Sequence, residues 1–489
     1  MLNINNHAAH LKREILVRMA KMQLKNTLIE EIDSIPRQLA PDGSSSIRCC
    51  IHHDREIIRK RVIARLGFSL ETAHEHKSLA FYAAEALKRK EPTWPILTVL
   101  DDACNACVRT QYLVTDACQA CLARPCKINC PKNAIEITNG RAHISKSLCI
   151  NCGICLQNCP FHAIIKIPVP CEEACPVGAI TKDENGKEVI DYNKCIFCGK
   201  CMSNCPFGAM MDKSQLVDVI AHIMLGKKNI HALYAPSIAA QFRAVPGQLE
   251  TALQKCGFDR VWEVAVGADL TADKEAVEFE ERMKAGDRLM TTSCCPAYVR
   301  AVKKHVPALL KCVSETKTPM HYTARLAKKA DPDCVTVFVG PCLAKRREAM
   351  DDDEVDYVLS IEEVGAFLIA KGIDIGKQEP TPENIIPTAS GRNFAITGGV
   401  ANAVKVRLKD NSILRAAVVN GLNKKGMAQL GIYGKMNEGS IEYKEDSPNL
   451  IEVMACEGGC IGGPSVVTNS KIAAMQLKKY VASGASDIS

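Results

Sequence analysis

The chain has 489 residues, more than one hydrophobic core accommodates, and this length predicts two or three domains. No apolar stretch reaches the roughly 18 residues of a membrane span, and the first residues lack the apolar run of a secretory signal. Without export, the 26 cysteines are expected to be metal ligands rather than disulfides, in a cytoplasmic protein. The net charge of +7 treats cysteine as neutral, and no aromatic RNA-binding motif accompanies it, so we expect no nucleic-acid partner.

Residues 1–98 are expected to form a mainly helical N-terminal region. Apolar residues recur at helical spacing in two stretches, Ile15, Met19 and Met22, and Leu79, Ala83 and Ala86. The segment 41–46, Pro-Asp-Gly-Ser-Ser-Ser, is expected to be a loop between helices. These patterns indicate packing or partner contact and no further function.

A metal site in this region is conceivable at Cys49, Cys50, His52 and His53. Adjacent cysteines followed by adjacent histidines fit no tetrahedral ligand spacing. The preferred interpretation is therefore the start of a helix with buried thiols.

Residues 99–212 contain sixteen cysteines, twelve of them in three consecutive motifs that each end in Cys-Pro. The motifs span residues 118–130, 149–159 and 195–205. They resemble the cluster motifs of bacterial ferredoxins, in which three cysteines bind one [4Fe-4S] cubane and the cysteine before proline binds its neighbour. The resemblance implies an α+β ferredoxin-like electron-relay domain.

The crossed pattern of these motifs implies the ligand sets. Two sets are Cys118, Cys121, Cys126 and Cys159, and Cys149, Cys152, Cys155 and Cys130. The remaining half-motifs are Cys104-x2-Cys107 and Cys171-x3-Cys175, and the simplest interpretation is one motif that is split by an inserted two-cluster unit. This gives the sets Cys104, Cys107, Cys171 and Cys205, and Cys195, Cys198, Cys201 and Cys175.

Sixteen thiolates divide evenly into four cubanes. The alternative is that Cys104 and Cys107 are spare buried thiols, which would leave three clusters. A cubane on four thiolates carries about −2, so four of them would roughly cancel the formal charge of +7.

Residues 220–484 are expected to form an α/β domain with largely parallel strands. Short apolar runs alternate with helical stretches, and the runs are Ile230–Leu233, Val261–Val266, Val335–Val339 and Leu450–Met454. Cysteine motifs follow these runs, and open α/β sheets usually place their sites at the ends of strands.

Three motifs in this part carry the most specific signal: Thr292-Ser-Cys-Cys-Pro296, Pro341-Cys-Leu-Ala-Lys345 and Cys456-Glu-Gly-Gly-Cys460. In order, separation and local sequence they resemble the active-site motifs of the [FeFe]-hydrogenases. That family holds a [4Fe-4S] cube on four thiolates, one of which bridges to a two-iron centre with CO, cyanide and a dithiolate bridge. The resemblance implies two small sheets flanking a buried metal cluster, the H-cluster.

By motif position, the cube ligands are Cys295, Cys342, Cys456 and Cys460, with Cys460 as the bridge. Iron in a cubane needs four soft ligands, but chemistry alone does not choose between Cys294 and Cys295. The resemblance implies that Cys294 is the free thiol that transfers protons, and the alternative is a merely structural neighbour.

A proton path to Cys294 is implied by the same resemblance. The segment Gly267-Ala-Asp-Leu-Thr271 is similar to a family motif and leads into a helix with Glu275 and Glu278 on one face. These glutamates and Ser314 match the family's relay residues. Taken singly, each would be interpreted as a solvated surface residue.

Residues around the two-iron centre are implied in the same way. Lys345 and Ser237 match the donors to the cyanide ligands, and a buried lysine is stable only beside an anion. Pro236, Met454 and Thr318 match residues that pack around the centre.

The chain departs from the common family pattern at several positions. Ala297-Tyr298 stands where Gly-Trp is usual, and Leu343 where Thr is usual. Gly340 and Glu457 stand where Met and Pro are usual, and Met320 replaces a polar residue. The stretch after Cys460 is short. The TSCCPA sequence is similar to a divergent subgroup often called group B.

The sequence therefore predicts an anaerobic, reversible hydrogenase that interconverts two protons and two electrons with H₂. The implied partners are a ferredoxin or similar small electron carrier and the hydrogenase maturation proteins. Two alternatives remain: a hydrogen sensor with the same cofactor, and a non-catalytic Nar-like iron–sulfur assembly factor. A scaffold would need no proton relay.

Overall fold

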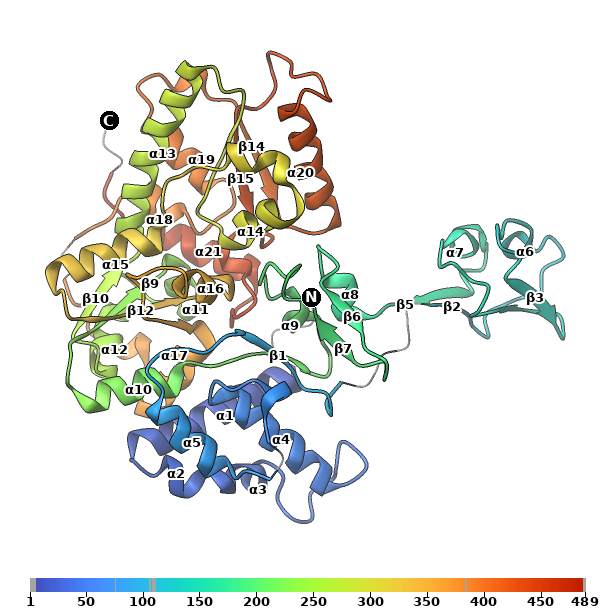
Figure 1. Ribbon diagram of the computed structural model, residues 1–489, viewed down its shortest axis with the longest axis horizontal. Helices are drawn as coiled ribbons and strands as arrows, with labels where there is room; N and C mark the ends of the chain where they lie inside the picture. The colour runs from blue at the N-terminus through green and yellow to red at the C-terminus, as the bar shows by residue number, and fades with distance from the viewer. Residues whose placement is uncertain (1–5, 75, 105–106, 108–110, 383–384, 487–489) are drawn as a thin grey trace.

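A computed structural model describes residues 6–74, 76–104, 107, 111–382 and 385–486. The N-terminal region is helical, as expected, and packs on the lower side of the body in Figure 1. Its helices are α1 (His7–Leu24), α2 (Leu28–Glu31), α3 (Ile35–Leu39), α4 (Ile51–Arg65) and α5 (Leu79–Lys88). The apolar faces foreseen from the spacing are buried together in one small core. Within the described ranges, no helix combines the length and apolar character needed to cross a membrane.

Two nested cysteine-rich units follow. In the outer unit, β1 (Leu97–Val99) pairs antiparallel with β8 (Met210–Asp212). Between them lie α8 (Pro170–Ala174), β6 (Ile180–Lys182), β7 (Glu188–Ile190) and α9 (Lys200–Asn204). This antiparallel pairing brings residues 97 and 212 side by side, so both ends of the outer unit lie together against the body.

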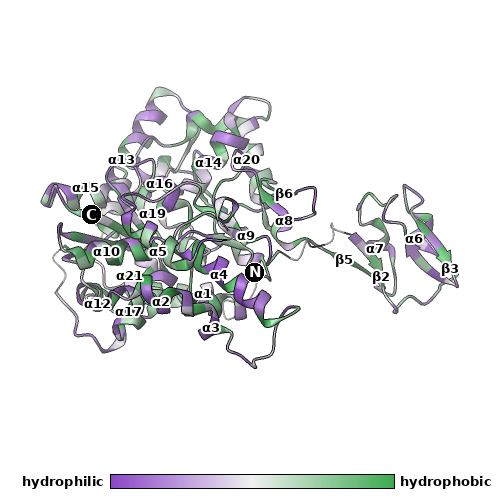
Figure 2. Cartoon of the chain, turned by 60° about the horizontal axis from the view of Figure 1, so that its bottom comes forward, coloured by the Kyte–Doolittle hydropathy of each residue, from purple (hydrophilic) through white to green (hydrophobic). Residues whose placement is uncertain are grey.

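The inner unit, residues 111–167, projects from the body (Figures 1 and 2). It leaves and returns through the antiparallel pair β2 (Gln111–Val114) and β5 (Ile164–Ile167), so it is an insertion between Cys107 and Cys171. Its remaining elements are β3 (Ile135–Thr138), β4 (Arg141–Ile144), α6 (Pro125–Ile128) and α7 (Ile154–Asn158). We call it the projecting unit.

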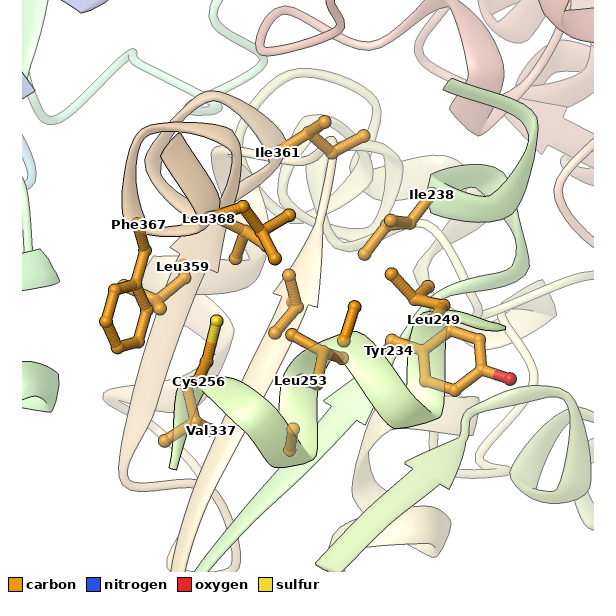
Figure 3. Close-up of a cluster of buried hydrophobic side chains, with 14 of the residues drawn as sticks. Tyr234, Ile238, Leu249, Leu253, Cys256, Val337, Leu359, Ile361, Phe367 and Leu368 are labelled. Carbon is orange, nitrogen blue, oxygen red and sulfur yellow. The ribbon is translucent and has the colours of Figure 1, made fainter. Parts of the chain in front are cut away.

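The first sheet of the α/β part is parallel, with strand order β10–β9–β12–β13. The strands are Arg260–Glu263, Ile230–Tyr234, Val335–Gly340 and Tyr357–Ser360. One face packs on α15 (Pro319–Ala330). The other packs on α10 (Leu216–Leu225), α11 (Pro236–Phe242), α12 (Gln248–Cys256), α17 (Ile361–Lys371) and α21 (Ser470–Val481), and Figure 3 shows part of this core. Burial on both faces explains why the inner strands β9 and β12 are mostly apolar.

The second sheet is also parallel, with order β11–β15–β14. Its strands are Met290–Thr291, Leu450–Met454 and Ala416–Asn420. One face packs on α14 (Pro296–His305) and α20 (Lys424–Asn437), and the other on α13 (Ala265–Ala285) and α19 (Gly399–Lys405). Two further short helices are α16 (Ala344–Ala349) and α18 (Ala389–Asn393). The two small parallel sheets flanked by helices are the expected fold class.

Three local expectations differ from the structure. The strand expected over 261–266 ends at Glu263, because α13 already begins at Ala265. The Gly267–Thr271 segment therefore lies inside that helix rather than before it. Cys49 and Cys50 do precede a helix, but their thiols are exposed, not buried.

Candidate active site and its cysteine clusters

The active-site cavity lies between the two sheets, at the carboxyl ends of their strands. Cys294 and Cys295 follow β11, Cys342 follows β12, and Cys456 and Cys460 follow β15. All five line one cavity, although the clusters are up to 166 residues apart in the chain. Parallel strands end at the same edge of a sheet, so the fold brings together what the sequence separates.

The four thiols predicted to hold the cube influence one another. Burial, and then the neighbouring Cys295, raises the pKa of Cys342 to about 12. Burial, followed by the nearby Cys342 and Cys295, also raises the pKa of Cys460 to about 12. Four such thiols can ionise together only if cations lie among them. Four thiolates around iron cations are the donor set that an iron–sulfur cube requires.

Polar groups reach the cavity from two sides. Ser237, at the start of α11, is buried, and its hydroxyl has no hydrogen-bond partner among the described residues. Lys345 lines the cavity, and its Nζ lies 2.7 Å from Glu348 Oε2 and donates to Thr318 Oγ1 at 3.1 Å. Burial lowers the pKa of Lys345, but Glu348 more than offsets this and leaves the pKa raised. An orphaned hydroxyl and a buried cation fit an anionic ligand in the cavity.

The remaining walls are apolar. Met454 and Pro236 line the cavity as expected. Met454 packs with Ala268, Phe394 and Cys294. Thr318 does not line the cavity and instead contacts Lys345, so its place is behind the wall. An apolar lining excludes water from groups that meet there.

A buried carboxylate, Glu275, lies near Cys294 and holds the residue before it. Glu275 is 0% exposed, and its Oε1 accepts a hydrogen bond from the backbone N–H of Ser293 at 3.1 Å. Its Oε2 makes no hydrogen bond of ordinary length among the described residues, but the Ser314 hydroxyl lies close enough to lower the pKa of Glu275. Burial raises the pKa of Glu275 to about 7, against hydrogen bonds from Ser293 that lower it. This carboxyl can therefore take up and release a proton near neutral pH.

Glu278, the second of the two glutamates, lies closer to the surface than Glu275. Ser314 Oγ donates to Glu278 Oε2 at 2.6 Å, and Arg282 lies 2.6 Å from Glu278 Oε1. Burial raises the pKa of Glu278, but the hydrogen bonds from Ser314 and Thr316 and the charge of Arg282 more than offset this and lower it. The Glu278 side chain is 17% exposed, so the line from Cys294 ends at water.

Most of the ferredoxin-type cysteines lie near other members of their proposed sets. Cys126 is influenced electrostatically by Cys121 and Cys159, and Cys107 by Cys104 and Cys205. Likewise, Cys171 is influenced by Cys205 and Cys107, and Cys201 by Cys198, Cys195 and Cys175. The fourth set, Cys130, Cys149, Cys152 and Cys155, lines one small cavity. Three proposed sets are thus complete in space, and Cys121, Cys126 and Cys159 of the remaining set also lie near one another.

One ferredoxin-type set adjoins the active site. Cys198 lines the active-site cavity and also a polar cavity that it shares with Cys456. Cys198 also contributes to the raised pKa of Cys456, after burial and the other cube thiols. In the other direction, Cys201 is influenced by Cys171 of the neighbouring set. The set that contains Cys171, the set that contains Cys201 and the active-site cavity therefore follow one another in space.

Sequence reasoning missed three residues at the site. Glu348 holds Lys345, and its position three residues later on a helix could have identified it. Ser293 lies within the TSCCP motif and joins Glu275 to the cysteines. Glu452 is buried in β15 and accepts from the N–H groups of Gly398 and Ala401 at the start of α19, and no sequence spacing signals this contact.

Comparison with known protein families agrees with this geometry. Residues 228–464 match the family described as "Iron only hydrogenase large subunit, C-terminal domain". The chain carries an iron-only hydrogenase domain. Residues 170–209 and 142–165 match a 4Fe-4S dicluster domain and a 4Fe-4S binding domain. The hydrogenase domain is therefore preceded by iron–sulfur domains of the ferredoxin type.

Curated relatives of this hydrogenase domain include proteins named as hydrogenases and a protein named as an iron–sulfur cluster assembly factor. Iron hydrogenase 1 of Clostridium pasteurianum is 30% identical over 327 residues, covering 56% of this chain and 57% of that protein. The NADP-reducing hydrogenase subunit HndD of Solidesulfovibrio fructosivorans is 28% identical, covering 52% and 53%. The cytosolic Fe-S cluster assembly factor NAR1 of Kluyveromyces lactis is 22% identical, covering 42% and 58%. The chain thus spans about half the length of these relatives.

A solved structure of a variant of the [FeFe]-hydrogenase HydA1 from Chlamydomonas reinhardtii is also similar to the chain. It is 23% identical, covers 52% of this chain and 84% of that chain, and has a TM-score of 0.42.

Proposed function

We propose that the protein is a reversible hydrogenase that catalyses 2 H⁺ + 2 e⁻ ⇌ H₂. The observation that carries this proposal is the meeting of Cys294 with Cys295, Cys342, Cys456 and Cys460 in one cavity, which Lys345 and Ser237 also line. The bound H-cluster would supply the iron at which protons and electrons combine. The protein would hold it, keep water out and move protons.

In this proposal, Cys295, Cys342, Cys456 and Cys460 would hold the cube, and Cys460 would also be shared with the two-iron centre. Lys345 and the free hydroxyl of Ser237 donate hydrogen bonds to anionic ligands in the cavity. Glu348 holds the Lys345 ammonium at 2.7 Å and so fixes its direction. Met454 and Pro236 form the apolar wall.

Protons would pass between water and Cys294 through Glu278, Ser314 and Glu275. The 2.6 Å hydrogen bond from Ser314 to Glu278 and the contact of Ser293 with Glu275 support this route. The pKa of about 7 at Glu275 suits a group that must both accept and release a proton.

Electrons would reach the cube through four [4Fe-4S] clusters on the predicted cysteine sets. The projecting unit would exchange electrons with a ferredoxin or similar small carrier. Such a protein would contain about 22 iron atoms, or about 18 if Cys104 and Cys107 are not ligands.

We also propose the domain limits 1–98, 99–212 and 220–484, membership of the TSCCPA subgroup and a cytoplasmic location.

Infrared spectroscopy tests the central claim. Protein matured with the hydrogenase assembly enzymes is expected to show CO and cyanide bands and to evolve H₂ from a chemical reductant. Bands without appreciable turnover would favour a hydrogen sensor. Iron–sulfur signals without these bands would overturn the proposal in favour of a scaffold, the function that the name of the NAR1 relative indicates.

A further inference from the structure

Arg61 of α4 is a buried arginine beside the outer ferredoxin unit. Only 8% of its surface is exposed. Its Nη1 donates to the carbonyl of Gly208 at 2.7 Å and its Nη2 to the carbonyl of Phe207 at 2.8 Å. These carbonyls directly follow Cys205-Pro206, so the guanidinium is held against the segment that carries Cys205.

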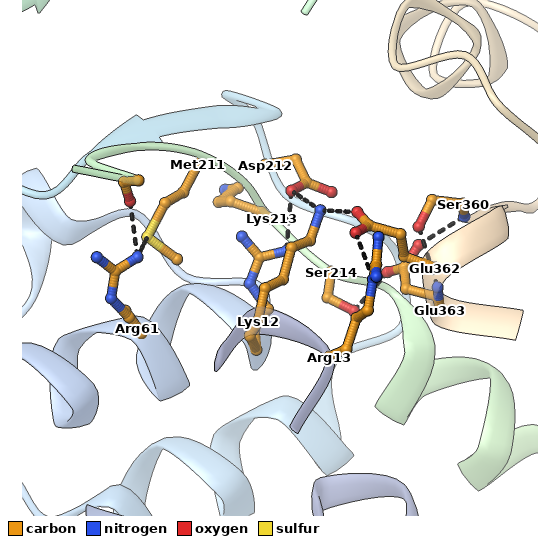
Figure 4. A network of polar contacts seen from close by, with 12 residues as sticks. Lys12, Arg13, Arg61, Met211, Asp212, Lys213, Ser214, Ser360, Glu362 and Glu363 are labelled. Carbon is orange, nitrogen blue, oxygen red and sulfur yellow. Dashed lines mark hydrogen bonds and ion pairs between the residues drawn. The ribbon is translucent and has the colours of Figure 1, made fainter. Parts of the chain in front are cut away.

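No carboxylate among the described residues pairs with this guanidinium. Figure 4 shows Arg61 set apart from Asp212 and Glu362, which hold the other cations of the region. Arg65, one turn further along α4, lies 2.8 Å from Asp212 Oδ1. Burial and the charge of Arg65 lower the pKa of Arg61 to about 10, whereas the Cys205 thiolate raises it. A buried charge without a counter-charge is costly, so an anion is expected nearby.

The proposed cluster on Cys104, Cys107, Cys171 and Cys205 is that anion. Ile57 and Ala64 of α4 pack in the same core as Cys104, Cys171 and Cys205, so the helix lies directly against this set. An oxidised cubane with four thiolates carries about −2, and reduction adds one more negative charge. A fixed positive charge stabilises the reduced form more than the oxidised form.

Other cations near this cluster are better compensated. Lys182, which influences Cys107, forms an ion pair with the buried Glu188. Two other cations, Arg48 and Lys187, donate to the carbonyls of Ala103 and Cys104. Both are partly exposed, and water screens their charges. Arg61 is therefore the fixed charge with the largest expected effect on the cluster.

We propose that Arg61 raises the reduction potential of the cluster on Cys104, Cys107, Cys171 and Cys205, so the N-terminal helical region sets one step of the electron path. This inference rests on the proposed cluster set. It assigns a role to residues 1–98, for which the sequence indicated only packing or partner contact.

Redox titration of the cluster-loaded full-length protein, followed by electron paramagnetic resonance, tests the proposal. The signal of this cluster is identified by its loss or conversion in Cys107→Ser. Arg61→Gln is expected to shift its midpoint potential to a more negative value, while Arg61→Lys, which keeps the charge, stays near wild type. The matched control is Arg55→Gln, on the same helix but paired with the exposed Asp42. Equal midpoints in Arg61→Gln and Arg55→Gln would overturn the proposal.

A second pair of variants covers the case in which Arg61→Gln fails to hold its cluster. Met211 Sδ lies 4.0 Å from Arg61 Nη1. Met211→Glu places a carboxylate beside the guanidinium and is expected to lower the midpoint relative to Met211→Gln, which adds a neutral group of the same size. Identical midpoints in these two variants would also overturn the proposal. If Cys107→Ser leaves every cluster signal unchanged, the cluster set itself is wrong, a failure distinct from an unmoved potential.

Discussion

The active-site cavity and the projecting unit use the same residue in opposite surroundings. The cavity thiols are enclosed between two sheets whose apolar cores contain many side chains besides cysteine. The core of the projecting unit is small, and its cysteines form much of it: Cys155 is buried with Tyr112 and Ile135, and other cysteines pack at its edge. Cys152 is exposed, as are Leu122, at 97%, and Ile128.

This difference shows two relations between metal and fold. The sheets can bury enough apolar surface to fold first and then receive a cluster. A unit of about 57 residues with few buried apolar side chains cannot, and small domains of this kind usually need a metal to fold. Backbone N–H groups of Ala142 and Ala120 lower the pKa of the Cys118 thiol, which favours the thiolate that binds iron.

The largest expected effect tests whether Cys294 and Cys295 have different roles in the cavity. Cys294→Ala removes the proposed proton carrier but no cube ligand, so the infrared bands should persist while turnover falls at least about 100-fold. Cys295→Ala should lose or damage the cube itself. The control is Cys312→Ala, a buried cysteine that does not line the cavity and should change the rate little. Wild-type H₂ evolution by Cys294→Ala would show that protons arrive by another route, with Glu457 the first candidate.

Removal of iron should separate the two regions. In hydrogen exchange, the apo-protein is expected to lose protection throughout residues 111–167, because the projecting unit lacks a core without its clusters. Strands β9 and β12, enclosed on both faces, should keep theirs. Equal protection of the projecting unit with and without iron would contradict the comparison.

Deletion of the projecting unit should leave the body intact. Gln111 and Ile167 are paired across β2 and β5, so a short glycine–serine link can join the flanking chain. The variant is expected to lose about eight iron atoms and much of its activity with a protein electron carrier, yet to keep its rate with a small chemical reductant. A misfolded or cube-free body would show that the unit has a structural role.

The smallest effect concerns a buried acid of the cavity region. The pKa of Glu275 rises from 4.5 to about 7 on folding, so folding takes up a proton between these values. Stability from this group is therefore fully present below about pH 4.5 and is lost as the pH rises through about 7. At pH 8.5, Glu275→Gln should be more stable than wild type by up to roughly 3 kcal/mol, and at pH 5 the gain should be small.

Calorimetric melting temperatures at the two pH values measure this difference. Glu281→Gln, an exposed change on the same helix, is the control and should show no such pH dependence. A gain of equal size at pH 5 and pH 8.5 would place the effect elsewhere than in the titration of Glu275.

Much of this site followed from local patterns. The three cysteine motifs identified the cavity lining and the hydrogenase family, and apolar runs located β9, β12 and β15 within a residue of their observed limits. Cys-Pro spacing also predicted neighbours such as Cys126 with Cys159 and Cys107 with Cys205. Such patterns succeed because ligand spacing and strand burial are properties of a few consecutive residues.

Contacts between distant segments were not predictable. Helical spacing placed Glu275 and Glu278 on one face, but only packing of α13 against the Ser293 and Ser314 segments gave one carboxyl a raised pKa and the other a lowered one. The exposure of Cys49 and Cys50 and the position of Thr318 behind Lys345 were missed for the same reason.

By itself, the sequence determined which thiols are present, how they are spaced and which strands lead to them. The tertiary structure alone decided which thiols are buried, which acid lies beside Cys294 and which cation lies beside Cys205. The physical reason is that ligand identity is a property of residue type, whereas pKa and counter-charge depend on desolvation and on distances across the fold.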